Sequence, residues 1–237
     1  MTHINLNSSN QKILTDFIEK LDRSFVRPPL LPDQFKKLIL NDPDFAQTVF
    51  DNILPIYYLS LSTIHWTPVE IVSLASEFLS DLPKNSKILD IGSGCGKFCL
   101  TLSYLIENEI HGIEQRIDLF NIAETIRATN NINHVKFING NMLDIVDWDQ
   151  YDVFYLYNPF QEHVTDIDLM RIDEVIDFND KYFAQYTSEV FRRLSWAAKG
   201  TKLITFHGYA GRVPDTWKLQ KSKVLYGGDL SLWEKIN

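Results

Sequence analysis

The fold of this chain is decided by the stretch Lys87-Ile88-Leu89-Asp90-Ile91-Gly92-Ser93-Gly94-Cys95-Gly96-Lys97-Phe98. Its first five residues form a short, mainly apolar run that ends at a glycine cluster, which is typical of a buried strand. Glycines then stand at three alternate positions, and a helical pattern follows. Glycine suits such a turn because its backbone reaches unusual dihedral angles and lets a ligand approach the bare peptide. The stretch therefore predicts a strand, a ligand-binding turn and a helix in direct succession.

Short apolar runs and amphipathic stretches continue to alternate towards the C-terminus. We expect further strands over residues 110–114, 135–138, 151–157 and 201–206, and helices over residues 98–108, 119–130 and 178–198. Strands that alternate with helices imply crossover connections and a mostly parallel sheet. The last two runs, 217–226 and 230–236, flank Gly227-Gly228, so an antiparallel pair should finish the sheet. The predicted fold class is α/β.

The N-terminal part of the chain is predicted to be helical. Apolar residues recur at helical spacing over residues 10–21, 33–40, 43–53 and 68–82, with prolines between these segments. Thr67 followed by Glu70 is an ordinary capping box for the last of these helices. Because no Gly/Ser-rich linker follows, we expect the helices to pack on the rest of the chain. We divide the chain into an N-terminal helical region, residues 1–66, and an α/β domain, residues 67–237.

Two carboxylates narrow the choice of ligand for the glycine turn. Asp90 stands two residues before Gly92, where it would oppose a pyrophosphate but would suit a cationic group such as the ammonium of a methionine moiety. Glu114 closes the next strand, eighteen residues after Gly96, where an acid accepts hydrogen bonds from ribose hydroxyls. The turn reads G-x-G-x-G rather than the dinucleotide spacing G-x-G-x-x-G. A nicotinamide enzyme and a nucleotide-free shell remain as alternatives.

These residues resemble the class I S-adenosylmethionine-dependent methyltransferase superfamily, from about Thr67 to the C-terminus. The resemblance implies a Rossmann-like, doubly wound sheet of seven strands that ends in a reversed hairpin. It implies S-adenosyl-L-methionine as the cofactor, with Glu114 at its ribose and Gln115 beside it. The amino-acid end of the cofactor is then held by the residues of the turn, namely Asp90, Gly92, Ser93, Gly94, Cys95 and Gly96.

The resemblance also assigns the adenine end of the cofactor. Family members often carry an acid directly after the glycine that follows the third strand, and here Asn141 follows Gly140. The amide oxygen of Asn141 can accept the same hydrogen bond from the adenine amino group, and Met142 would cover the adenine face. Asp144 is the alternative acid, and a plain surface turn is the alternative interpretation of Asn141.

The triplet Asn158-Pro159-Phe160 ends the fourth strand, at the edge of the sheet where α/β proteins bind ligands. Pro159 should bias Asn158 towards an extended backbone. The triplet is similar to the Asn-Pro-Pro-aromatic motif of methyltransferases that act on amino groups, without the second proline. It is also similar to the Asn-Asn-Phe of seven-stranded lysine methyltransferases, whose Thr-Pro entry segment is similar to Thr67-Pro68. We therefore take Asn158, Pro159 and Phe160 as catalytic candidates, and Asn158 also as a cofactor-binding residue, although a strand-ending turn explains the triplet equally well.

Composition limits the location and partners of the protein. The chain has 31 acidic against 23 basic residues, a net charge of −8, which disfavours general nucleic-acid binding because that needs Lys and Arg to displace counterions. No window approaches the roughly 18 apolar residues of a membrane span. We read no signal peptide, and expect a cytoplasmic protein without a membrane partner. Cys95 and Cys99 should lie on one helix as small buried hydrophobes, and two thiols do not make a metal site.

The predicted function is methyl transfer to a nitrogen acceptor. A protein side chain, such as a lysine, is the first choice of acceptor, since an acidic chain suits a basic target. A nucleic acid or a small metabolite is the alternative acceptor, with the N-terminal helical region as a lid over a small pocket. Acceptor contacts are expected from Asn158 and Phe160, and more weakly from Tyr57, Tyr58 or Trp66. A cofactor-binding protein without catalysis is the alternative from another class.

Overall fold

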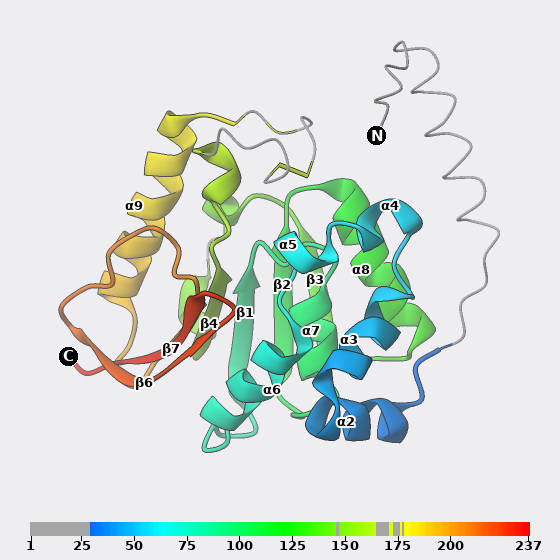
Figure 1. The fold of residues 1–237 in the computed structure, drawn as a ribbon. Coiled ribbons are helices and arrows are strands. Elements are labelled where there is room, and N and C mark those ends of the chain that lie inside the picture. Colours follow the sequence, from blue (N-terminus) through cyan, green and yellow to red (C-terminus); the bar gives the residue numbers. More distant parts are fainter. Residues whose placement is uncertain (1–28, 146, 165–170, 173–175, 177) are drawn as a thin grey trace, which may run out of the picture.

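A computed structural model describes residues 29–145, 147–164, 171–172, 176 and 178–237. The helix predicted over residues 10–21 lies outside the described residues. In the described part of the chain, helices cover both faces of one mixed sheet (Figure 1). No helix there is long and apolar enough to cross a bilayer.

The sheet has seven strands in the order β3-β2-β1-β4-β5-β7-β6. They are β1 (Lys87–Ile91), β2 (Glu109–Glu114), β3 (Val135–Asn139), β4 (Val153–Tyr157), β5 (Lys202–Phe206), β6 (Trp217–Leu225) and β7 (Gly228–Lys235). Strands β1 to β5 pair in parallel, and β7 pairs antiparallel with both β5 and β6. The α/β, Rossmann-like fold and its closing antiparallel pair are therefore confirmed.

The longer helices differ from the predicted ones mainly at their ends, and the short helices α4 and α5 lie where no helix was predicted. They are α2 (Pro32–Asn41), α3 (Pro43–Asp51), α4 (Ile56–Leu59), α5 (Ser62–His65), α6 (Val69–Phe78), α7 (Lys97–Leu102), α8 (Ile117–Thr129) and α9 (Asp180–Trp196), with 3-10 turns η1 (Met142–Asp144), η2 (Trp148–Gln150) and η3 (Gln161–His163). Helix α7 ends well before the predicted residue 108, because Tyr104 and Leu105 donate to carbonyls three residues back and tighten the chain into turns.

Two local predictions in this part of the chain are wrong. Thr67 does not cap α6: its hydroxyl lies 2.9 Å from the Tyr155 phenol oxygen, and the Val69 N–H donates to the side chain of Gln47 instead. A buried tertiary partner thus replaces the local capping box. Cys95 lies in the turn before α7 and not on the helix with Cys99. Both thiols are free and fully buried, as expected for small hydrophobes.

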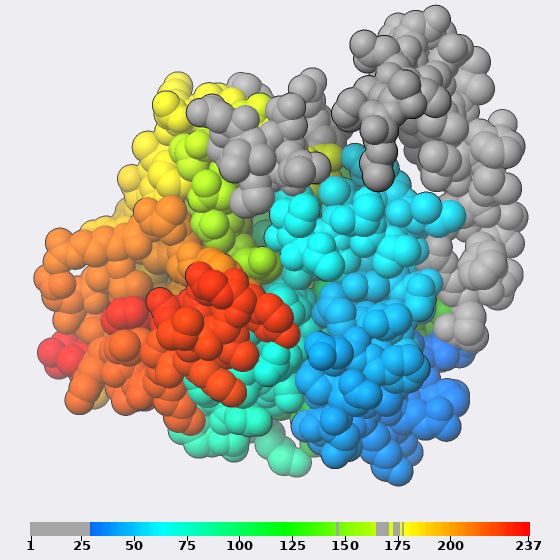
Figure 2. Space-filling model, in the orientation of Figure 1, coloured from blue at the N-terminus to red at the C-terminus, as the bar shows by residue number. Residues whose placement is uncertain are grey.

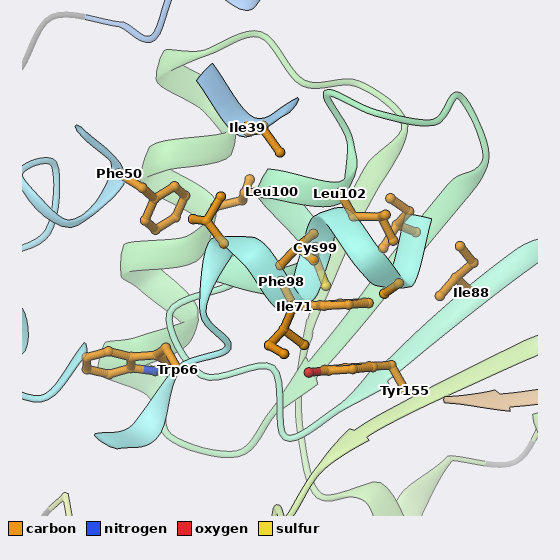
Figure 3. Close-up of a cluster of buried hydrophobic side chains, with 14 of the residues drawn as sticks. Ile39, Phe50, Trp66, Ile71, Ile88, Phe98, Cys99, Leu100, Leu102 and Tyr155 are labelled. Carbon is orange, nitrogen blue, oxygen red and sulfur yellow. The ribbon is translucent and has the colours of Figure 1, made fainter. Parts of the chain in front are cut away.

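Alternate residues of the central strands pack into two separate cores, one on each face of the sheet. Ile88 of β1 joins the core under α2, α3, α6, α7 and α8, whereas Leu89 and Ile91 join the core under α9. In the first core the rings of Phe98 and Tyr155 stack face to face, with centroids 3.6 Å apart (Figure 3).

The N-terminal helices share the first core with the sheet. Ile39 of α2 and Phe50 of α3 are buried in one cluster with Ile71 of α6 and Leu100 of α7 (Figure 3). The expected packing on the rest of the chain is thereby confirmed for α2, α3 and α6. Figure 2 shows α2 to α5, in blue and cyan, as one continuous surface with their neighbours. The boundary between residues 66 and 67 therefore runs through a shared core, and it stays a prediction.

Candidate cofactor and acceptor site

A cavity of about 220 Å³ lies at the carboxyl ends of the parallel strands, and residues of α5 and η3 also line it. It is lined by Ile64, His65, Trp66, Ile91, Gly92, Gly94, Ile113, Glu114, Gln115, Arg116, Gly140, Asn141, Met142, Tyr157, Asn158, Pro159, Phe160, Gln161, Glu162, His163, Ile172, Tyr186 and His207. This is the edge of an α/β sheet at which ligands bind. The cavity thus collects residues that follow β1, β2, β3, β4 and β5.

The glycine turn presents bare backbone to this cavity at Gly92 and Gly94. Gly94 has a φ of +56°, and a Cβ there would lie 2.5 Å from the indole nitrogen of Trp66. Gly96 serves packing instead, because a Cβ there would lie 2.5 Å from the Phe137 ring. Of the residues predicted for this turn, Ser93, Cys95 and Gly96 do not line the cavity.

Glu114 at the end of β2 is buried and lines the cavity. Its carboxylate accepts hydrogen bonds from the Gly94 N–H at 3.0 Å and from the Arg116 N–H at 2.8 Å. Burial raises the pKa of Glu114, and these two backbone donors oppose the shift. Two carboxylate oxygens offer about four acceptor positions, so the side chain can hold the turn and still accept from ligand hydroxyls.

Asp90 occupies a different environment from Glu114. It is buried, it accepts a hydrogen bond from the Cys99 thiol at 3.3 Å, and it does not line the cavity. In this geometry Asp90 therefore cannot touch a ligand ammonium in the cavity directly. Burial raises the pKa of Asp90 from 3.8 to about 7, with the nearby Glu114 carboxylate adding to the shift.

This shift predicts an unusual pH dependence of stability. Between about pH 4 and pH 7 the folded chain binds the Asp90 proton more tightly than the unfolded chain, so the free energy of unfolding falls as the pH rises. At pH 8, Asp90→Asn should therefore be more stable than the wild type by up to about 4 kcal/mol, since each pKa unit is worth about 1.4 kcal/mol. At pH 4 the two proteins should unfold at similar urea concentrations. A difference that does not vary between these pH values would contradict the shift.

Asn141 and Met142 follow β3, and both line the cavity. The Asn141 side-chain amide donates to Gln115 and to the Tyr186 hydroxyl, while its oxygen accepts from the Leu143 N–H at 3.0 Å. The oxygen predicted to receive the adenine amino group thus already caps η1 and has one lone pair left. Asp144, the alternative acid, is exposed and does not line the cavity.

The triplet Asn158-Pro159-Phe160 lines the cavity, but its backbone is not as predicted. Asn158 has a φ of +38°, in the left-handed region, so the expected extended conformation is wrong. Asn is one of the few residues that adopt this region, and the Asn158 N–H is held by the Gly208 carbonyl at 2.9 Å. Phe160 is buried and stacks on Tyr186 of α9, with centroids 5.1 Å apart.

Of the three weaker acceptor candidates, only Trp66 lines the cavity. Trp66 is buried and lies against Gly94 at the cavity wall, so it is both a core anchor and a lining residue. Tyr57 and Tyr58 do not line the cavity. Tyr57 donates instead to the Ile172 carbonyl at 2.9 Å, which joins α4 to the segment after η3.

Several lining residues were not singled out from the sequence. Arg116 pairs with Glu162 at 2.8 Å, and both side chains are largely buried. His65 lines the cavity together with His163 and His207. His207 directly follows β5, so its place at the carboxyl edge of the sheet was a usable signal. No group of three metal-type ligands occurs among the residues that the structure describes.

Comparison with known proteins agrees with this geometry. Residues 82–199, about half of the chain, match the family model described as a methyltransferase domain. No curated protein sequence matches the chain significantly.

Three solved structures illustrate the similarity of fold. An RNA methyltransferase from Salinibacter ruber, in complex with S-adenosyl-L-homocysteine, is 19% identical with a TM-score of 0.50, over 72% of this chain and 93% of that one. The putative methyltransferase yhhF from Escherichia coli is 15% identical with a TM-score of 0.52, over 70% and 84%. TrmN from Thermus thermophilus is 14% identical with a TM-score of 0.54, over 73% and 50%. With its methyltransferase domain and its seven-stranded sheet, the chain belongs to the class I S-adenosylmethionine-dependent methyltransferase superfamily.

Proposed function

We propose that this enzyme transfers a methyl group from S-adenosylmethionine to a nitrogen atom of a protein side chain. The observation that carries the proposal is that Asn158, Pro159 and Phe160 share one cavity with the glycine turn and Glu114. In the proposal the donor site and the acceptor site are therefore continuous, as a direct group transfer requires.

The cavity suits the cofactor on its β1, β2 and β3 side. Gly94 has no Cβ, so the Trp66 indole lies directly against its backbone at the cavity wall, and the buried Glu114 carboxylate accepts the Gly94 N–H. In the proposal, Gly92 and Gly94 hold the amino-acid end, Glu114 the ribose, and Asn141 with Met142 the adenine. When bound, the cofactor supplies an activated methyl group on a sulfonium centre.

The remaining residues act on the acceptor and on water. The Asn158 carbonyl and side chain can receive N–H groups of the acceptor, and the buried Phe160 and Trp66 help to exclude water from the cavity. We assign the described part of the N-terminal helical region, residues 29–66, to the cover of this site, because Ile64, His65 and Trp66 form part of the wall.

The acceptor class can be tested by transfer of radioactive methyl groups. Purified protein with labelled S-adenosylmethionine should label a protein band in a cell lysate, and the label should be absent with Glu114→Ala, which lacks the carboxylate at the cofactor side. Label in an RNA or small-molecule fraction alone would contradict a protein acceptor. Tight binding of S-adenosylhomocysteine with no label in any fraction would favour a non-catalytic binding protein.

A further inference from the structure

Two residues at the ends of neighbouring strands share an uncommon backbone conformation. Asn158 follows β4 and His207 follows β5, and both have positive φ, at +38° and +55°. The Asn158 N–H donates to the carbonyl of Gly208 at 2.9 Å, which fixes the two strand ends side by side. Residues held in this region concentrate where the surrounding structure requires a particular side-chain position. Here both side chains line the same cavity.

The imidazole of His207 lies at the cavity wall without a hydrogen bond to the described residues. Its ring packs over Gly228 of β7, where a Cβ would lie 2.3 Å from ring carbon Cε1. The Tyr157 ring lies 5.8 Å away, between centroids. His163, by contrast, already receives the Asn179 N–H on its Nδ1 at 3.4 Å. His207 therefore has ring nitrogens available for a ligand, and its side chain is exposed.

The order of strands puts His207 on the acceptor side of the cavity. The residues assigned to the cofactor follow β1, β2 and β3, which are neighbours in the sheet. Strands β4 and β5 lie on the other side of β1, so Asn158 and His207 stand beyond the amino-acid end of the cofactor. An acceptor that approaches the methyl group from this side meets these two residues.

We propose that His207 is a catalytic residue that removes the proton from the acceptor nitrogen. The inference rests on the proposed function. A protonated acceptor amine gives one proton to a ring nitrogen of His207, and its freed lone pair then attacks the methyl carbon. The new C–N bond forms as the C–S bond breaks, and the bonding electron pair returns to sulfur. The methylated amine leaves, and the exposed imidazolium releases its proton to solvent.

The surroundings of His207 favour a neutral imidazole that can accept a proton. Burial lowers the pKa of His207, and the carboxylate of Asp229 on β7 opposes the shift. Tyr157 on β4 is the other titratable group packed against the ring, and burial raises its pKa, so it stays neutral at physiological pH. A base with a pKa near or below the working pH is suited to general base catalysis.

The position of His207 can be tested without knowing the acceptor. Histidine-labelled protein is titrated by NMR with S-adenosylhomocysteine, whose sulfur is neutral, or with sinefungin, whose protonated amine stands near the place of the transferred methyl group. A positive charge at about 6 Å should lower the His207 titration midpoint by about 0.5–2 pH units in the sinefungin complex. His134, which lies 3.2 Å from the Ser103 carbonyl outside the cavity, is the internal control and should not shift.

The outcomes of this titration separate the two proposals. If both compounds bind and the His207 midpoint is the same in each complex, His207 is remote from the methyl group and the inference is wrong. If neither compound binds, the proposed function fails first. The His207→Gln variant assigns the signal by its disappearance, and circular dichroism checks that the variant is folded.

A kinetic experiment uses, as its methyl acceptor, whichever fraction becomes labelled. His207→Gln should lose about 10²–10⁴-fold in methyl-transfer rate with unchanged affinity for S-adenosylhomocysteine. The wild-type rate should rise with pH through the His207 titration midpoint, and this rise should be absent from the variant. His134→Gln, outside the cavity, should keep this rise. A rise of the rate with pH that persists in His207→Gln would show that His207 does not take the proton.

Discussion

Asp51→Ala is expected to lower the free energy of unfolding by about 3–5 kcal/mol, because it leaves a buried ammonium without its counter-charge. Lys97, the residue directly after Gly96, is fully buried, and its Nζ lies 2.6 Å from Asp51 Oδ1. Ser62 bonds to both groups, at 2.8 Å from Lys97 Nζ and 2.7 Å from Asp51. The network joins α3 and α5 to the start of α7. Urea unfolding of wild type and variant at neutral pH measures the effect.

The pH dependence of this loss has a definite sign. Burial already lowers the pKa of Lys97 from 10.5, and the Asp51 charge opposes that shift, so its removal lowers the pKa further. The unfolded chain then binds more protons than the folded one at alkaline pH, and stability rises with pH. Asp51→Ala should therefore recover part of its loss as the pH rises towards 10.5, the ordinary pKa of lysine.

Two controls distinguish a buried pair from ordinary ion pairing. Asp81→Ala removes the exposed one of the two carboxylates that pair with Lys202, and should cost no more than about 1 kcal/mol because Glu234 stays 3.8 Å from the Lys202 Nζ. Replacing both members of the buried pair, with Asp51→Leu and Lys97→Met, should restore much of the stability because no unpaired charge is left. A loss in Asp51→Ala as small as that of Asp81→Ala would mean that Lys97 finds water or another partner.

Gly94→Ala should weaken binding of S-adenosylhomocysteine by about 10- to 100-fold, which corresponds to the 1–3 kcal/mol typical of an overpacked site. The new Cβ would lie 2.5 Å from Trp66 Nε1 and 2.8 Å from Trp66 Cδ1, so the indole must move within the cavity. The methyl group also covers the bare backbone that the ligand needs. Isothermal titration measures the affinity, and circular dichroism reports the fold.

Gly200→Ala is the matched control for backbone strain. Gly200 also has positive φ, at +89°, but no atom lies within 4 Å of its added Cβ and it does not line the cavity. It should lose about 1–2 kcal/mol of stability from the left-handed conformation alone, with unchanged ligand affinity. Equal loss of affinity in both variants would refute a role for Gly94 in ligand binding.

The sequence was sufficient where structure depends on local pattern. Residues 87–91 form a buried apolar run between polar residues and glycines, and β1 has these same bounds. The three glycines of the turn require positive φ, and all three have it. Glu114 could be placed because the end of β2 is fixed relative to β1 by the parallel register.

What the sequence could not supply depends on partners distant along the chain. Asn158 is left-handed because its N–H bonds to Gly208, fifty residues later, against the extended bias of Pro159. Thr67 bonds to Tyr155 rather than to its own helix. Lys97 follows a glycine turn and resembles a ligand-facing cation, yet Asp51 holds it inside the core. No local pattern reports these contacts, because each needs the packed sheet and helices.

The position of β7 has a consequence for how the protein is made. This strand is synthesised after the other six, yet it lies between β5 and β6 in the sheet. While residues 228–235 are still inside the ribosome, β5 has an open edge and β6 has no neighbour to pair with. The emerging chain therefore carries an exposed strand edge of the kind that attracts other chains, and closure of the sheet waits for this late insertion.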